Sequence, residues 1–293
     1  MKQKQGVIHE DERMKERVKV GLALGGGGAR GLAHIGVLDV LQQENIPVDM
    51  IAGASAGALV GAVYAQGKDT SVIKNVALKL DWKKLISLAD FTMPRTGFIG
   101  GRKVGNLLKS IMGRDVSFSD LQIPFACVAT DINTCGEVVI EEGSVMEAVR
   151  ASISLPGIFT VAKWKGRYLV DGGLVNPVPV SVLRRMGADL VIAVNVIPDI
   201  HHRVMTAGEE TKADLKEPNI FSVIVQSLQM AQCLLVKHNI QDADIIISPN
   251  AAHIGFGEFY RAQECIEQGE IAARGSVLEI KKRLEGFVSN LPH

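Results

Sequence analysis

Glycine-rich turns that follow short apolar segments limit most strongly what this chain can fold into. The first such unit comprises an apolar strand over residues 18–24, a turn over 25–28 and a helical pattern over 32–43. The second comprises a strand over 47–52, a turn over 53–57 and a helix of small residues over 58–65. Strands that alternate with helices are typical of a parallel sheet whose two faces are covered by helices. The order of these units therefore predicts an α/β fold.

The rest of the chain extends this pattern. Further strands are predicted over 123–130, 138–140, 168–170, 190–196 and 243–248, and helices over 144–152, 221–240 and 263–284. Ser144 followed by Glu147 forms a capping box, which marks the start of the first of these helices. We expect 1–17 to be a polar leader and 18–293 a single domain, in which 199–219 is a mobile loop. The irregular stretch 87–103 is either a lid or acyl-binding wall, or a surface loop with buried anchors.

Charge and composition exclude several classes of function. The chain carries 32 basic and 32 acidic side chains, so we expect no nucleic-acid partner and only a transient, apolar contact with a membrane surface. Apolar residues make up 47% of the chain, which excludes a disordered protein. Residues 1–20 lack the apolar core of a signal peptide, and 51–67 is too short and too rich in small residues to span a membrane. The four cysteines show no metal-binding spacing, so we expect thiols and a reducing, cytoplasmic location.

The second glycine-rich turn carries a candidate nucleophile. Residues 53–57 read Gly-Ala-Ser-Ala-Gly, which fits the G-x-S-x-G pattern of a serine on a sharp turn between a strand and a helix. Gly53 and Gly57 would relieve the steric crowding of such a turn. The N-terminus of the following helix favours negative charge that develops beside Ser55. We therefore interpret Ser55 as a nucleophile, the alternative being a structural turn.

The first glycine-rich turn admits three interpretations: a flexible turn, a dinucleotide-binding loop, or an oxyanion hole built from backbone N–H groups. Gly26, Gly28 and Gly31 satisfy G-x-G-x-x-G. The next strand leads to Ser55, however, and does not end in the acidic residue that a dinucleotide site requires. The oxyanion hole is favoured, since each key donor in such a hole contributes about 3–4 kcal/mol. Arg30 would hold this loop or attract an anionic headgroup, and the first role is favoured.

Two residues that could complete a catalytic triad with Ser55 follow later in the chain. Asp171 ends a predicted strand and is followed by Gly172 and Gly173, and His253 lies beyond a later strand. The order Ser, Asp, His permits a catalytic triad. The residues themselves do not decide whether this triad forms.

Several segments together resemble the patatin-like phospholipase family, in particular its bacterial branch related to the catalytic domain of neuropathy target esterase. In order, they read LALGGGGARGLAHIG (22–36), GASAG (53–57), ATD (129–131), RASISLPGIF (150–159), VDGGLVNPVP (170–179) and MGAD (186–189). The chain departs from the pattern at Thr160 and Val161, where relatives often carry a proline after the phenylalanine. This departure concerns the shape of a loop and not the chemistry.

The resemblance implies a three-layer α/β sandwich with a mostly parallel central sheet, and a Ser–Asp dyad instead of a triad. Ser55 would be the nucleophile and Asp171 the base, with His253 non-catalytic. The oxyanion loop would be Gly26, Gly27 and Gly28, and the supporting motif residues are Gly25, Arg30, Gly31, Gly53, Gly57, Gly172 and Gly173. No metal or cofactor is implied. The expected substrate is a lipid or fatty-acyl ester; a carboxylesterase, a thioesterase or a non-catalytic lipid-binding protein are the alternatives, and no oligomeric state is predicted.

Overall fold

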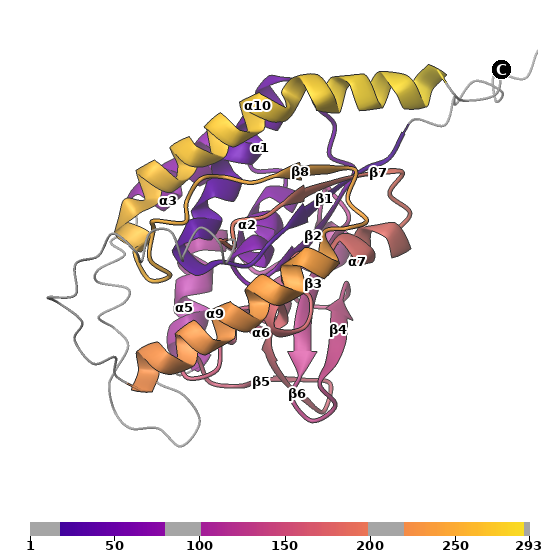
Figure 1. Cartoon of the computed structure of the whole chain (residues 1–293). Helices are drawn as coiled ribbons and strands as arrows, with labels where there is room; N and C mark the ends of the chain where they lie inside the picture. Colours follow the sequence, from indigo (N-terminus) through magenta and orange to yellow (C-terminus); the bar gives the residue numbers. More distant parts are fainter. Residues whose placement is uncertain (1–17, 80–100, 199–219, 290–293) are drawn as a thin grey trace, which may run out of the picture.

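The strands form one mixed sheet. The computed structural model describes residues 18–79, 101–198 and 220–289 (Figure 1). Within these residues eight strands pair in the order β5-β6-β3-β2-β1-β7-β8, and β4 pairs with β3 off this path. The parallel strands are β1 (Val20–Leu24), β2 (Met50–Ala54), β3 (Phe125–Asp131), β7 (Leu190–Val194) and β8 (Ile245–Ile247). The antiparallel pairings involve β4 (Gly136–Ile140), β5 (Ala162–Trp164) and β6 (Arg167–Asp171). The sheet is therefore mostly parallel, as predicted, with an antiparallel end.

Side chains alternate between the two faces of the sheet along its central strands. On β1, Val20, Leu22 and Leu24 belong to one buried cluster and Ala23 belongs to the other. The first cluster includes residues of α1 (Ala33–Gln43), α2 (Ala56–Ala65) and α10 (Ala262–Ser289), and the second includes residues of α7 (Val180–Arg185) and α9 (Ile220–Asn239). In Figure 1, α10 and α1 lie above the sheet and α9 and α7 below it. The predicted three-layer α/β sandwich is confirmed.

The predicted helix after Ser144 is also confirmed. The Ser144 hydroxyl accepts a hydrogen bond from the Glu147 N–H at 3.0 Å and caps α6 (Val145–Ser152). Elements that the sequence pattern did not predict are α3 (Thr70–Lys79), α5 (Gly101–Met112), α7 and β5. The last three residues of 87–103 were expected to be irregular but belong to α5, because Val104, Leu108 and Ile111 recur at helical spacing. The remainder of that stretch, the leader and the predicted mobile loop lie outside the described residues.

The cysteines are all in described residues and are free thiols. Cys135 is exposed, whereas Cys127, Cys233 and Cys265 are buried. Burial raises the pKa of the Cys127 thiol to about 12, so this group stays protonated and unreactive at neutral pH. Among the helices described, none combines the length and the hydropathy that crossing a bilayer requires.

Candidate active site

The ends of β2 and β6 meet at one edge of β3. β2 runs parallel to β3, and its last residue, Ala54, pairs with Val128. β6 runs antiparallel to β3, and its last residue, Asp171, pairs with Ala129. Because β4 occupies the other edge of β3 at both Val128 and Ala129, β2 and β6 share one edge and point toward each other. Ser55, the residue after β2, is thereby brought next to Asp171.

Ser55 lies on a strained turn between β2 and α2. Its backbone φ of 52° and ψ of −121° are unusual for a residue with a side chain. The Ser55 N–H donates a hydrogen bond to the Ser152 hydroxyl at 2.8 Å, which helps to hold the turn. A Cβ atom on Gly53 would lie 2.6 Å from the backbone of α2, and one on Gly57 would lie 2.1 Å from the Leu24 carbonyl oxygen. Both glycines are therefore required by close backbone packing.

The Ser55 hydroxyl is paired with a buried carboxylate. Its Oγ donates to Asp171 Oδ2 at 2.6 Å. Asp171 Oδ1 accepts from the Gly173 N–H at 2.8 Å, which fixes the plane of the carboxylate. Burial raises the pKa of Asp171 to about 6, and the hydrogen bonds from Ser55 and Gly173 oppose this rise. At neutral pH the group is mainly an ionised carboxylate and a stronger base than an ordinary aspartate.

The glycine loop after β1 lies against this pair of residues. The Cβ position of Gly26 is 3.2 Å from the Ser55 Cβ atom. Gly25 donates its N–H to the Val194 carbonyl, and Gly26 donates to the Pro177 carbonyl. In the described part of the chain, no acceptor faces the N–H groups of Gly27 and Gly28. Within the described residues, two of the three predicted oxyanion donors therefore have an N–H group without an acceptor, whereas that of Gly26 is already engaged.

Buried side chains behind the loop hold it in place. His34 on α1 is fully buried, and its Nε2 lies 2.7 Å from the Gly25 carbonyl oxygen. Burial lowers the pKa of His34 to about 4, so the ring is neutral at pH 7 and Nε2 carries the proton donated to Gly25. Arg30 is also buried, and its Nε donates to the Gly27 carbonyl at 3.4 Å. Its burial fits the loop-holding role that the sequence favours.

His253 has a different partner from the one a catalytic triad requires. Its Nε2 lies 2.7 Å from Glu264 Oε1 on α10, in a half-exposed position. Glu264 also accepts from Arg261, and these two partners hold the pKa of Glu264 at about 2. Both Asp171 oxygens accept from other groups, Ser55 and Gly173. This geometry favours the dyad over the triad.

The structure adds residues that pattern reasoning did not select. Ser152, which accepts the Ser55 N–H, lies inside the RASISLPGIF segment but was not singled out there. Thr130 Oγ1 donates to the Asp171 carbonyl oxygen at 2.8 Å and anchors the end of β6. Gln232 on α9 is buried, and its Nε2 lies 2.6 Å from where a Cβ on Gly173 would be. No motif marks Gln232, because only the packing of α9 brings it to the site.

Thr160, where the chain departs from the family pattern, has a defined place. The Arg150 guanidinium donates through Nη2 to the Thr160 hydroxyl at 2.8 Å and to its carbonyl at 2.7 Å. Arg150 also binds the Ser154 hydroxyl, and the Ser154 carbonyl accepts from the Asp171 N–H at 3.0 Å. Thr160 is therefore tied to the strand that carries the carboxylate.

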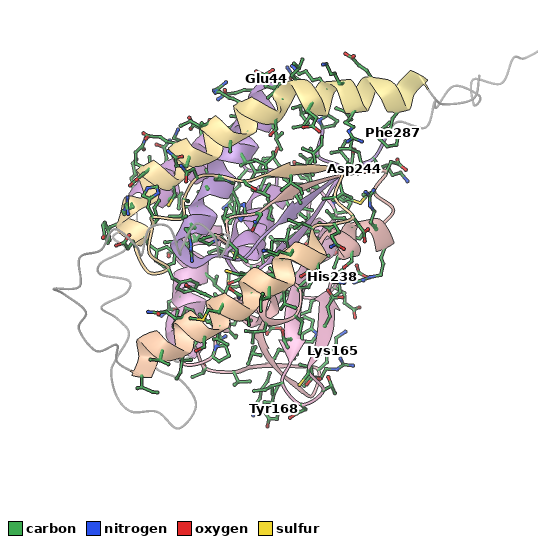
Figure 2. The ribbon with its side chains drawn as sticks, in the orientation of Figure 1. Glu44, Lys165, Tyr168, His238, Asp244 and Phe287 are labelled. Carbon is green, nitrogen blue, oxygen red and sulfur yellow. The ribbon has the colours of Figure 1, made fainter. Side chains whose placement is uncertain are left out.

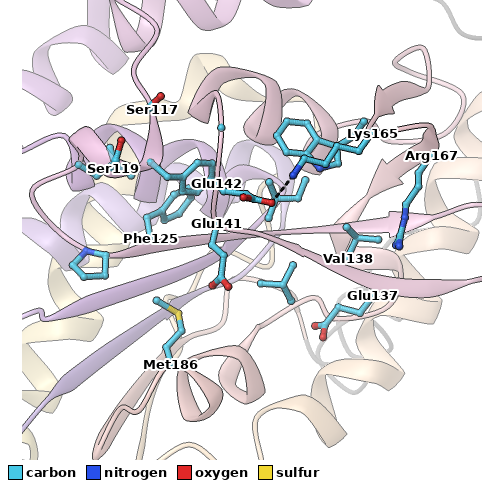
Figure 3. A pocket seen from close by; sticks show the side chains of 17 residues that line it. Ser117, Ser119, Phe125, Glu137, Val138, Glu141, Glu142, Lys165, Arg167 and Met186 are labelled. Atoms are coloured by element: carbon cyan, nitrogen blue, oxygen red, sulfur yellow. Dashed lines mark hydrogen bonds and ion pairs between the residues drawn. The ribbon is translucent and has the colours of Figure 1, made fainter.

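A hollow of about 1210 Å³ lies along β4, away from these residues (Figure 3). Its lining includes Glu137, Glu142, Lys165 and Met186, and neither Ser55 nor Asp171. Glu142 pairs with Lys165 across it, as the dashed line in Figure 3 shows, and Glu137 pairs with Arg185. The hollow therefore contains none of the predicted site residues, and these charged side chains are already paired.

An α/β sandwich with a serine on a glycine-bracketed turn at the end of a central strand is an arrangement typical of serine ester hydrolases. The model of the patatin-like phospholipase family matches residues 22–184. The chain belongs to this family of ester hydrolases, as the sequence segments predicted.

Two curated relatives agree with this assignment, and one solved structure shares the fold. The chain is 39% identical over 184 residues to neuropathy target esterase sws of Drosophila melanogaster, covering 60% of this chain and 13% of that protein. It is 37% identical over 202 residues to an uncharacterized NTE family protein of Mycobacterium bovis, covering 69% and 53% respectively. The crystal structure of VipD from Legionella pneumophila has a similar fold, with a TM-score of 0.51 at 14% identity over 90% of this chain and 67% of that one. The chain spans about half or less of the length of these two curated relatives.

Proposed function

We propose that this chain is a serine acyl hydrolase that cleaves carboxylic esters of lipids, with Ser55 as the nucleophile and Asp171 as the base. The observation that carries the proposal is the 2.6 Å hydrogen bond from Ser55 Oγ to Asp171 Oδ2 on a glycine-bracketed turn. The same turn adjoins the N–H groups of Gly27 and Gly28, which have no acceptor among residues 18–79, 101–198 and 220–289. Nucleophile, base and oxyanion donors are the three groups that acyl transfer requires.

In the proposed reaction, Ser55 Oγ attacks the ester carbonyl carbon as its proton passes to Asp171 Oδ2. The carbonyl oxygen becomes an oxyanion, which the Gly27 and Gly28 N–H groups and the N-terminus of α2 stabilise. The bond to the alcohol breaks, Asp171 returns the proton to the leaving oxygen, and an acyl–Ser55 ester remains. A water molecule then gives a proton to Asp171 and attacks the acyl carbon. Collapse of this second intermediate releases the carboxylic acid and restores the proton to Ser55.

We propose a lipid acyl ester as the substrate, and a cytoplasmic enzyme that contacts membranes peripherally. The family is one of phospholipases, and an esterase is among the related proteins. The formal net charge is zero, so the protein as a whole has no electrostatic attraction to a polyanion. We therefore expect the enzyme to recognise its substrate through the apolar acyl chain. The free thiols fit a reducing compartment.

The pH dependence of hydrolysis should follow the ionisation of Asp171. Only the carboxylate form accepts the Ser55 proton, so kcat/KM is expected to fall about tenfold per pH unit below a midpoint near the folded pKa of about 6. Initial rates on a soluble ester such as p-nitrophenyl butyrate, at constant ionic strength, measure this profile. A midpoint near pH 4 would mean that Asp171 is not desolvated as described. The His253→Ala variant should give the same midpoint as the wild type.

A fluorophosphonate probe tests the nucleophile directly. The probe should label the wild-type protein at Ser55, because the activated hydroxyl attacks phosphorus and displaces fluoride. Ser55→Ala should remove all labelling, whereas Ser152→Ala, which keeps the nucleophile, should still be labelled at a reduced rate. Peptide mapping by mass spectrometry locates the adduct. Absence of labelling in the folded wild-type protein would overturn the enzyme assignment.

A further inference from the structure

Helix α9 presents an unusual distribution of side chains. Toward the sheet it buries Val225, Cys233 and Val236 together with two amides, Gln229 and Gln232. Its opposite side exposes five large apolar residues, which we call the α9 outer face: Ile220, Val223, Ile224, Met230 and Leu234. These positions recur at helical spacing, so they form one stripe. Part of the apolar surface of this helix therefore faces solvent although polar groups of the same helix are buried.

The helix also lacks negative charge. None of its 20 residues is acidic, and its basic side chains are Lys237 and His238 in the last turn. Figure 2 labels His238 near the C-terminal end of the helix. Helix α10, on the other face of the sheet, differs in this respect: it carries acidic residues throughout its length, namely Glu264, Glu267, Glu270, Glu279 and Glu285. The absence of acidic groups on α9 removes the repulsion that lipid phosphates would otherwise meet.

The α9 outer face belongs to the helix that borders the candidate site. Gln232, on the inner side of α9, contacts Gly173, which in turn donates its N–H to Asp171. Further along, the Cγ2 atom of Ile224 lies 3.7 Å from where a Cβ on Gly157 would be. Gly157 belongs to the segment between α6 and β5, close in sequence to Ser152 and Ser154. A bilayer in contact with the α9 outer face is thus separated from the carboxylate and its supporting segment by the thickness of this one helix, about 10 Å.

We infer that the α9 outer face is the surface with which this protein lies on a phospholipid bilayer. The inference rests on the proposed function, because a lipid acyl ester must leave a bilayer to reach Ser55. Five exposed apolar side chains on one helix can insert at the level of the acyl boundary, and no acidic side chain of this helix opposes the approach of lipid phosphates.

A second copy of the chain fits this face less well. The α9 outer face extends from Ile220 to Leu234, which is about 22 Å of helix, and a stripe roughly 10 Å wide along it covers about 220 Å². Stable protein interfaces bury about 800 Å² on each partner. A bilayer needs no such area, since insertion of a few large side chains gives a weak and reversible association.

A pair of double variants tests this surface. Met230→Gln/Leu234→Gln alters the α9 outer face, at residues that are 54% and 63% exposed. Ile271→Gln/Leu278→Gln makes the matched change on α10, at residues that are 63% and 66% exposed. Co-sedimentation with vesicles of ether-linked phosphatidylcholine, which carry no ester to hydrolyse, measures binding. Hydrolysis of p-nitrophenyl butyrate measures the site independently of any surface.

We expect the α9 variant to bind vesicles at least about tenfold more weakly, a loss of about 1.4 kcal/mol, with unchanged hydrolysis of the soluble ester. The α10 variant should bind as the wild type does. Equal binding by all three proteins, equal loss in both variants, or no vesicle binding by the wild type would overturn the inference. So would a wild-type dimer, seen by light scattering, that only the α9 variant dissociates. Absence of soluble-ester hydrolysis in the wild type would contradict the proposed function. The vesicle-binding result would still show whether the α9 outer face binds a bilayer.

Discussion

Asp171→Asn is expected to abolish turnover and, at the same time, to stabilise the fold. Asparagine can still accept from the Gly173 N–H and can donate to Ser55 Oγ, so the local packing is kept. It cannot take the serine proton. We therefore expect kcat to fall by about 10⁴-fold, the upper end of what general-base help supplies.

The gain in stability comes from removing a buried charge. The folded pKa of Asp171 is about 6 against an ordinary value of 3.8, so burial penalises the carboxylate by about 3 kcal/mol. A raised folded pKa means that this penalty is absent below pH 3.8 and is complete above about pH 6. The variant should therefore have a higher free energy of unfolding than the wild type at pH 8, by up to about 3 kcal/mol, and the difference should shrink toward pH 4.

Urea denaturation of both proteins at the two pH values, with kcat on a soluble ester, measures these effects. His253→Ala is the control, since its ring binds Glu264 and should leave turnover unchanged. Near-normal turnover in Asp171→Asn would overturn the dyad. Loss of turnover in His253→Ala would restore the triad. A stability difference that grows toward acidic pH would show that burial does not raise the Asp171 pKa.

Gly57→Ala is expected to displace the serine turn although alanine is the better helix former. A Cβ atom at this position would lie 2.1 Å from the Leu24 carbonyl oxygen and 2.7 Å from that of Gly25. Both contacts are to backbone, which cannot rotate away as a side chain can. Relieving them requires α2 to move away from β1, and Ser55 moves with it. We expect a loss of about 1–3 kcal/mol in the free energy of unfolding, typical of overpacking, and a large fall in fluorophosphonate labelling.

Gly275→Ala is the matched control on α10. No atom lies within 4 Å of the Cβ position there, so only the helix propensity changes. This variant should be more stable than the wild type by about 0.5–1 kcal/mol, with normal labelling. The opposite signs of the two substitutions distinguish close packing from a general intolerance of alanine. A Gly57→Ala protein as stable and as reactive as the wild type would contradict the packing described here.

Much of the fold is predictable because its determinants are local. Apolar strands that alternate with helical patterns are read from neighbouring residues, and so are the turns between them and the cap at Ser144. The antiparallel end of the sheet is harder to predict from the sequence. β5 is three residues long and lies at the edge of the sheet, where a strand needs little burial and so carries little apolar pattern. The start of α5 is hard to predict because the glycines there are typical of loops.

The sequence alone determined the α/β class, the serine turn and the glycine loop, because each depends on residues that are adjacent in the chain. Only the tertiary structure decided which groups meet. Ser55 and Asp171 are 116 residues apart, and they touch because β2 and β6 end at consecutive residues of the same edge of β3. The same packing engages the N–H of Gly26 with the Pro177 carbonyl, whereas the N–H groups of Gly27 and Gly28 have no acceptor in the part of the chain that the structure describes. Contacts between distant segments depend on strand register and helix packing, and a pattern of neighbouring residues predicts neither of them.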